Sequence, residues 1–170
     1  MYKQRNKGYS LIEMIVYLAI FTSVSVLVIN SFIIVLGSFS ATRTNRDLLE
    51  SGAVVVERIA REIRQAESVD VANSTLGSSP GALQLNSNNS GGTPVIIEFR
   101  IVNGALNLYE DDILVRNLLG QNISVTSLIF RRISTTNGEG VKIELTLQDS
   151  ISKNLQTASF YNTIILRGGY

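Results

Sequence analysis

The chain contains no cysteine and no histidine. Their absence excludes disulfide bonds, thiolate chemistry, imidazole general bases and the commonest zinc ligands. Tryptophan is also missing, and only two prolines occur in 170 residues. No Gly-rich phosphate loop follows a predicted strand, and no nucleophile is accompanied by a recognisable base. We therefore predict that the protein is not an enzyme, that it needs no cofactor or metal, and that packing alone stabilises its fold.

The chain has no large excess of charge of either sign, because 14 Asp and Glu balance 15 Lys and Arg. What the chain does have is a long apolar run from Leu11 to about Phe39, in which Glu13 is the one charged residue. A helix of about 20 apolar residues spans a bilayer. A carboxylate inside such a segment costs a few kcal/mol, so by default it marks a functional site.

A short basic leader precedes this run and contains Lys3, Arg5 and Lys7. Basic residues beside an apolar segment favour the cytoplasmic side of a membrane. In a secretory signal peptide, the small residue at the cleavage site follows the apolar core. Here Gly8 precedes the core, so cleavage after Gly8 would leave a protein that starts at Tyr9 and keeps its apolar helix.

The stretch from Lys7 onward, GYSLIEMIVYLAIF after the lysine, resembles the prepilin signal of type IV pilins and type II secretion pseudopilins. The resemblance implies that prepilin peptidase cleaves between Gly8 and Tyr9 and that the Tyr9 amine is methylated. It also implies that Glu13, the fifth residue of the mature chain, serves subunit assembly. Two features differ from major pilins: tyrosine replaces the more usual phenylalanine, and no proline interrupts the apolar helix.

Physical chemistry suggests a partner for Glu13. Cleavage would create a positive amine at Tyr9, and in a filament that amine could meet the Glu13 carboxylate of a neighbouring subunit. Breaking a buried pair of this kind costs about 3–5 kcal/mol, so the pair would set the register between subunits. Alternatively, Glu13 reaches the lipid headgroups from the end of an ordinary membrane anchor.

A second helical pattern follows the apolar run. Apolar or small residues recur every three or four positions, which predicts an amphipathic helix; they are Leu48, Gly52, Val55, Ile59, Ile63 and Ala66. Because no proline separates the two patterns, we predict one helix from about Ser10 to Ser68. Its likeliest points of bending or local melting are Gly37 and Gly52.

The exposed side of this helix carries Arg58, Arg61 and Arg64, which could bind phosphate groups. Glu57 and Arg61 are four positions apart, as are Arg58 and Glu62, so each pair can neutralise itself on the helix surface. We favour a solvated, self-neutralised face. DNA contact and a salt bridge between subunits remain the alternatives.

After the helix, residues 69–94 are rich in Asn, Ser and Gly and are predicted to form a loop, with one short strand at residues 82–85. Further strands are predicted at residues 95–102, 105–109, 113–115, 123–133, 141–147 and 160–166 from their alternating pattern. Asn103-Gly104 is a strong hairpin signal because both turn positions require positive φ. Asp111-Asp112 marks a second turn, which would complete a three-stranded meander.

Two further groups of residues are candidate sites. Glu110, Asp111 and Asp112 could contribute to a calcium site, but adjacent acids in a hairpin turn usually face solvent. Aromatic residues alternate with aliphatic ones along the predicted strands and are expected in the core or on a sheet face; they are Tyr109, Phe130, Phe160 and Tyr161.

A long helix followed by an antiparallel sheet is the architecture of the pilin family, so the resemblance extends over most of the chain. The predicted fold is α+β, with the amphipathic half of the helix packed on the sheet. The predicted segments are a leader (1–8), a membrane or filament-core helix (9–39), an amphipathic helix (40–68), a loop (69–94) and a sheet domain (95–170). RIAREIRQA, VIIEFRIVNGALNLYEDD and VKIELTL resemble J-type minor pseudopilins and W-type minor pilins.

This resemblance implies a minor pilin or pseudopilin that primes or caps a type IV pilus or a type II secretion pseudopilus. Its partners would be prepilin peptidase, other minor and major pilins or pseudopilins, and membrane lipid before assembly; DNA is a possible partner that the sequence does not indicate. It would sit in the cytoplasmic membrane as a single-pass protein, with its N-terminus inside and its C-terminal domain outside, and then enter a filament. The alternative is an uncleaved single-pass protein that presents a ligand- or DNA-binding β-domain.

Overall fold

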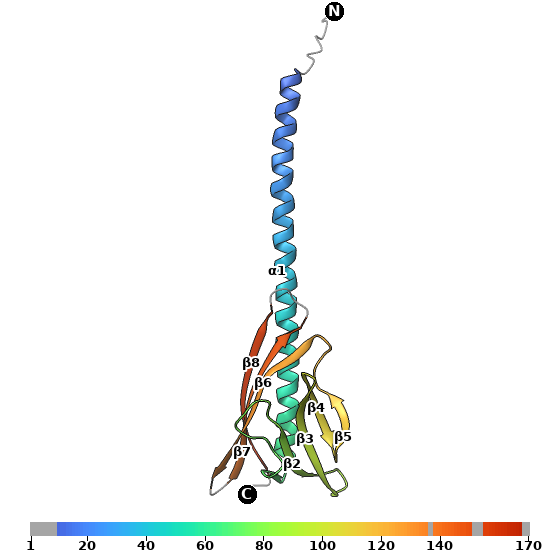
Figure 1. Ribbon diagram of the computed structural model, residues 1–170, viewed down its shortest axis with the longest axis vertical. Helices are drawn as coiled ribbons and strands as arrows, with labels where there is room; N and C mark the ends of the chain where they lie inside the picture. Colours follow the sequence, from blue (N-terminus) through green and yellow to red (C-terminus); the bar gives the residue numbers. More distant parts are fainter. Residues whose placement is uncertain (1–9, 136–137, 151–154, 168–170) are drawn as a thin grey trace, which may run out of the picture. The chain divides into compact units, whose positions relative to one another are not determined.

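The computed structural model describes residues 10–135, 138–150 and 155–167. One helix, α1 (Leu11–Gln65), is followed by eight strands within the described residues. The chain divides into two compact units, residues 1–40 and residues 41–170. The predicted α+β class is confirmed, with a long N-terminal helix followed by antiparallel strands (Figure 1).

The first unit contains the apolar part of α1. Its large apolar side chains are exposed from Leu11, at 78%, to Phe39, at 70%. Gly37 lies within the uninterrupted helix. By length and composition, α1 is the one helix of the described residues that could cross a membrane.

In the second unit, the remainder of α1, together with Ala66 directly after it, buries the predicted stripe. All six of its residues are buried: Leu48, Gly52, Val55, Ile59, Ile63 and Ala66. The helix ends at Gln65 rather than at Ser68. The chain becomes extended there because the Glu67 amide donates to the Asn86 carbonyl (2.8 Å) and Ser68 pairs with Asn86 across the first two strands.

The first sheet has five antiparallel strands in the order β1-β2-β3-β4-β5. Their bounds are β1 Ser68–Val69, β2 Leu83–Asn88, β3 Pro94–Val102, β4 Ala105–Glu110 and β5 Ile113–Asn117. The β3–β4 hairpin turns at Asn103 (φ 53°) and Gly104 (φ 78°), as the sequence predicts. The expected meander of β3, β4 and β5 is confirmed.

The short strand predicted at residues 82–85, inside the predicted loop, is present but continues further, to Asn88. Residues Leu83–Asn88 form β2, which pairs along its whole length with β3. Alternate side chains of β2 are buried, at Leu83, Leu85 and Ser87. Because four of its six residues are Asn, Ser or Gln, its composition resembles a loop, while its alternation is that of a half-buried strand.

A second sheet contains β6 (Ile123–Thr135), β7 (Gly138–Asp149) and β8 (Thr157–Ile165) in that order. The strands therefore form two sheets where a single sheet was expected. Every residue of β5 is exposed, so this strand ends the first sheet, and β6 pairs with β7 instead. One backbone hydrogen bond, from the Val125 amide to the Gly104 carbonyl (2.9 Å), links the start of β6 to the β3–β4 turn.

A single hydrophobic core joins the second half of α1 to both sheets (Figure 1). Its largest fully buried side chains include Ile59 from the helix, Phe99 from the first sheet and Phe130 from the second. Gly52 lies against the Phe160 ring of β8: a Cβ atom built at Gly52 would be 2.1 Å from two atoms of that ring. Gly52 therefore permits close packing in an uninterrupted helix.

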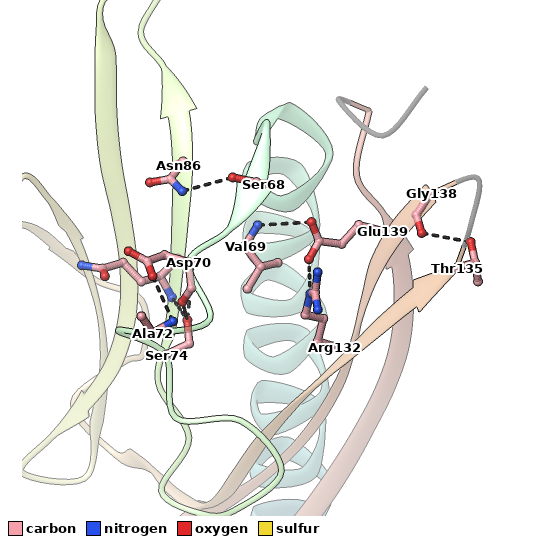
Figure 2. A network of polar contacts seen from close by, with 11 residues as sticks. Ser68, Val69, Asp70, Ala72, Ser74, Asn86, Arg132, Thr135, Gly138 and Glu139 are labelled. Atoms are coloured by element: carbon pink, nitrogen blue, oxygen red, sulfur yellow. Dashed lines mark hydrogen bonds and ion pairs between the residues drawn. The ribbon is translucent and has the colours of Figure 1, made fainter.

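Polar contacts link β1, the strand that follows the helix, to the second sheet (Figure 2). The Glu139 carboxylate at the start of β7 accepts hydrogen bonds from the Val69 amide (3.5 Å) and from the Arg132 guanidinium. The Asn73 side chain donates to Asp70 at 2.8 Å and is the main cause that lowers the pKa of this carboxyl.

Two ion pairs lie on the helix surface. The expected pair of Arg58 with Glu62 is present at 2.7 Å. Glu57 contacts Arg64 at 3.1 Å, two turns away, instead of the expected Arg61. Part of this face is therefore self-neutralised, and Arg61 takes no part in an ion pair within the described residues.

Candidate assembly site

Glu13 lies in the first turn of α1. The Ser10 carbonyl accepts hydrogen bonds from the amides of Glu13 (3.0 Å) and Met14 (3.2 Å), so Ser10 occupies the N-cap position and Glu13 is the third residue of the helix. Free amides at a helix N-terminus favour a nearby negative charge. The backbone therefore offsets part of the cost of placing an acid at the start of an apolar segment.

Tyr17 is a partner of Glu13 that the sequence analysis missed. Its hydroxyl donates to Glu13 Oε1 at 3.2 Å, from one helical turn further along the chain. Side chains four residues apart share one face of a helix, and this spacing could have identified the pair. Glu13 is half-buried in a segment whose apolar side chains are exposed.

The other hydroxyl groups of the apolar segment bond differently. Those of Thr22, Ser23, Ser25, Ser31 and Ser38 donate to carbonyl groups one turn earlier in the same helix. Such bonds satisfy a hydroxyl without water, which suits a helix in lipid or in a packed filament. Tyr17 instead donates to the Glu13 carboxylate, so this hydroxyl provides Glu13 with a hydrogen-bond donor inside the apolar segment.

The surface around Glu13 is apolar. Leu11, Leu18 and Phe21 are exposed at 78%, 64% and 69%. A continuous apolar surface of this kind requires lipid or other helices around it. The Glu13 carboxylate and the Tyr17 hydroxyl lie together in this apolar surrounding.

Comparison with known proteins supports the same segment. Residues 3–29 match the family model of the prokaryotic N-terminal methylation motif. The chain carries that motif. Neither the curated proteins nor the solved structures gave a match.

The methylation motif covers the basic leader, Glu13 and Tyr17, and it is consistent with the type IV pilin and pseudopilin family. Together with the apolar helix, it fits a single-pass membrane anchor. It also implies processing by prepilin peptidase and assembly with other pilins. Gly8 and Tyr9, the predicted cleavage and methylation residues, lie outside the residues that the structure describes.

The acids of the β4–β5 turn have a structural use. Asp111 and Asp112 adopt positive φ angles of 49° and 64°, and Asp111 Oδ1 accepts a hydrogen bond from the Ile96 amide at 2.9 Å. Within the described part of the chain, no group of three or more His, Cys, Asp and Glu side chains is placed to hold a metal ion.

Proposed function

We propose that this chain is a minor pilin or pseudopilin, a non-enzymatic structural subunit that primes or caps a type IV pilus or a type II secretion pseudopilus. The observation that carries the proposal is Glu13. It is a carboxylate in the first turn of an apolar helix, inside the methylation motif, with Tyr17 as its partner on the same helix. The domain at residues 41–170 would contact other minor subunits.

The assembly step follows from charge. Cleavage after Gly8 would give Tyr9 a positive amine, which methylation leaves able to carry its charge. Before assembly, the Glu13 carboxylate has the Tyr17 hydroxyl as a donor. On entry into the filament, the amine of one subunit would bind the Glu13 carboxylate of its neighbour. The pair would thus select one register among the many that apolar surfaces alone allow.

The substitution Glu13→Leu tests this role. It makes the helix more apolar, so membrane insertion should be unharmed, while the partner for the amine is removed. Leaving the amine unpaired in the filament core costs about 3–5 kcal/mol, or more than about a hundredfold in the assembly constant. The measurement is the amount of subunit in sheared filaments relative to the amount in membranes.

Met14→Leu is the matched control, because it changes the neighbouring side chain without removing a charge. It should assemble as the native chain does. Glu13→Leu subunits at native abundance in the filament would show that the carboxylate is a bystander. An N-terminus that remains at Met1 in cells would instead favour an uncleaved single-pass protein that presents a ligand- or DNA-binding domain.

A further inference from the structure

Strand β5 forms a free edge of the first sheet (Figure 1). It pairs with β4 on one side, and no other strand of the described residues pairs with it. A free edge carries a row of backbone N–H and C=O groups without partners in the sheet, which makes it a template for a further strand. Lysine and proline, which commonly protect such an edge, are both absent from β5.

The side chains of β5 are apolar for an edge strand. Ile113, Leu114 and Val115 are consecutive, and each is more than half exposed. On β6 and β8, the edges of the second sheet, large exposed apolar residues occur singly. Three neighbouring exposed aliphatic side chains on a free edge are suited to a contact with another protein.

A hollow of about 170 Å³, here named the β5 hollow, lies between β5 and α1. Its charged lining consists of Arg58 from α1 and Arg116 from β5. The rest of its lining is apolar and includes Val54, Leu108, Val115 and Leu118. Because a water molecule takes about 30 Å³, the hollow has room for one medium-sized side chain.

An irregularity in β5 brings two neighbouring residues to this hollow. Successive side chains of a regular strand point to opposite faces, yet Val115 and Arg116 both line the β5 hollow. The register between β4 and β5 shifts between Leu108 and Tyr109, and Val115 has no partner of its own in β4. Bulges of this kind re-aim a side chain. The bulge therefore explains how Arg116 reaches the hollow together with Val115.

Of the two arginines, Arg116 lacks a counter-charge. Arg58 Nη2 contacts Glu62 Oε1 at 2.7 Å, so the charge of Arg58 is balanced. Within the described residues, the buried Arg58 Nε has no hydrogen-bond partner, and no ion pair involves Arg116. Buried N–H groups normally have an acceptor. The β5 hollow thus has one positive charge in excess and unused hydrogen-bond donors.

Neighbouring acids do not supply the missing acceptor. Asp47 and Glu50 line a separate, adjacent hollow. Arg43 and Arg46 precede them by four positions, the spacing at which opposite charges balance each other on a helix surface. Neither acid forms an ion pair with Arg116. The hollow is therefore complementary to a carboxylate that comes from outside this chain.

The edge strands of a second copy do not offer that carboxylate. The described edge strands β5, β6 and β8 contain no Asp or Glu, and β1 spans two residues. Asp111 and Asp112 precede β5, but both have positive φ angles, which an extended strand does not adopt. A strand of another protein, with an acid in its sequence, meets the requirement that the edges of this chain do not.

We propose that the edge of β5 binds an extended segment of another protein as a sixth strand, with an acidic side chain of that segment in the β5 hollow. In this mode of recognition, main-chain hydrogen bonds supply affinity and side-chain pockets supply specificity. An added strand lies about 4.8 Å from β5, so an acid opposite Arg116 is within reach of its guanidinium. The inference goes beyond the proposed function, because it holds for a filament subunit and for a domain presented on a membrane alike.

Peptide binding to the full chain in detergent micelles tests the proposal. The probe is a fluorescently labelled seven-residue peptide in which threonine and valine alternate and glutamate takes the central place. Two control peptides carry glutamine or lysine there. Fluorescence anisotropy should show saturable binding of the glutamate peptide, about threefold to fivefold weaker binding of the glutamine peptide, and the weakest binding of the lysine peptide. A glutamate peptide that does not saturate the chain at about millimolar concentration would overturn the proposal.

Arg116→Glu reverses the charge of the hollow. Because Arg116 is exposed and outside every ion pair of the described residues, this variant should keep the native Tm and bind the lysine peptide most tightly. Arg61→Glu is the matched control, since Arg61 is also exposed and unpaired but does not line the β5 hollow. It should still prefer the glutamate peptide. An unchanged order of the three peptides on the Arg116→Glu chain would refute the role of the hollow.

A backbone-modified peptide separates strand addition from simple charge attraction. Methylation of the backbone nitrogens of the glutamate peptide removes its main-chain donors and keeps every side chain, so binding should be lost. Binding as tight as that of the unmodified peptide would show that no sixth strand forms. Displacement of the labelled peptide by an excess of unlabelled full chain would mean that a second copy occupies the edge, and would overturn the proposed partner. A chain that is methylated at Tyr9 but binds no peptide would refute this inference and leave the proposed function intact.

Discussion

Gly52 packs against the ring of Phe160, and this contact decides whether Gly52→Ala stabilises or destabilises the fold. A Cβ atom at Gly52 would lie 2.1 Å from Cε2 and Cζ of Phe160 and 2.7 Å from Cε1. Carbon atoms in contact are about 3.5 Å apart, so Gly52→Ala requires the ring to move by about 1.4 Å. Overpacking of this kind costs about 1–3 kcal/mol. Alanine in a helix returns about 1 kcal/mol relative to glycine.

The expected net effect of Gly52→Ala is therefore a destabilisation of about 1 kcal/mol, with an upper limit near 2 kcal/mol. The assay is thermal unfolding of the full chain in detergent micelles, followed by circular dichroism in the near ultraviolet, which reports tertiary packing. For a domain of this size, 1 kcal/mol corresponds to a shift of about 3–5 °C in Tm.

The control is the same substitution in a Phe160→Ala chain. With the ring removed, only the helix propensity remains, so Gly52→Ala should now stabilise the protein by about 1 kcal/mol. A reversal of sign between the two backgrounds assigns the cost to the ring. If Gly52→Ala stabilised the native chain and the Phe160→Ala chain equally, the close contact would not exist and Gly52 would be an ordinary helix residue.

Three further predictions concern other parts of the chain. Tyr17→Phe removes the hydrogen-bond donor to Glu13. In vesicles it should shift the infrared carboxyl band of isotope-labelled glutamate while the helix content stays unchanged. An unchanged band would mean that the hydrogen bond is absent. Lys142 and, secondarily, Arg131 lower the pKa of Glu144 from its usual 4.5, so this carboxyl stabilises the fold above that pH and the contribution is lost on acidification. Glu144→Gln should therefore flatten the fall of Tm below about pH 4.5, and an unaltered acid limb would refute the assignment. A fragment of residues 43–170 should be soluble and should unfold cooperatively. A fragment of residues 69–170 should aggregate, because it lacks the helix that covers the apolar faces of the sheets. If both fragments unfolded cooperatively at the same Tm, the helix would not pack on the sheets.

The sequence predicted those parts of the fold that depend only on residues close together in the chain. The buried stripe of α1 follows from the 3.6-residue period, and the β3–β4 turn follows from the need for positive φ at Asn103 and Gly104. Glu13 was identified as a candidate functional residue because a single carboxylate in an apolar segment costs free energy. Tyr17 was within reach of the same reasoning, through the spacing of four residues on a helix.

Long-range packing decided what the sequence analysis missed. β2 continues to Asn88, beyond the strand predicted at residues 82–85, because its polar second half pairs with β3. The division into two sheets depends on which strand β6 selects as its partner, a choice that no local window contains. Gly52 was expected to be a point of bending or local melting. Its actual role, close packing against Phe160, could not be read from the neighbouring sequence because the two residues are more than a hundred positions apart.

The central claim is that the chain is processed and assembled as a pilin-type subunit, and the mass of its N-terminal peptide in cells tests this most directly. The account predicts a peptide that begins at Tyr9 and carries one methyl group on its amine. Gly8→Leu, which places a bulky side chain at the cleavage site, should block processing and leave the leader attached. A native chain that still begins at Met1, or a Gly8→Leu chain that begins at Tyr9, would contradict the account.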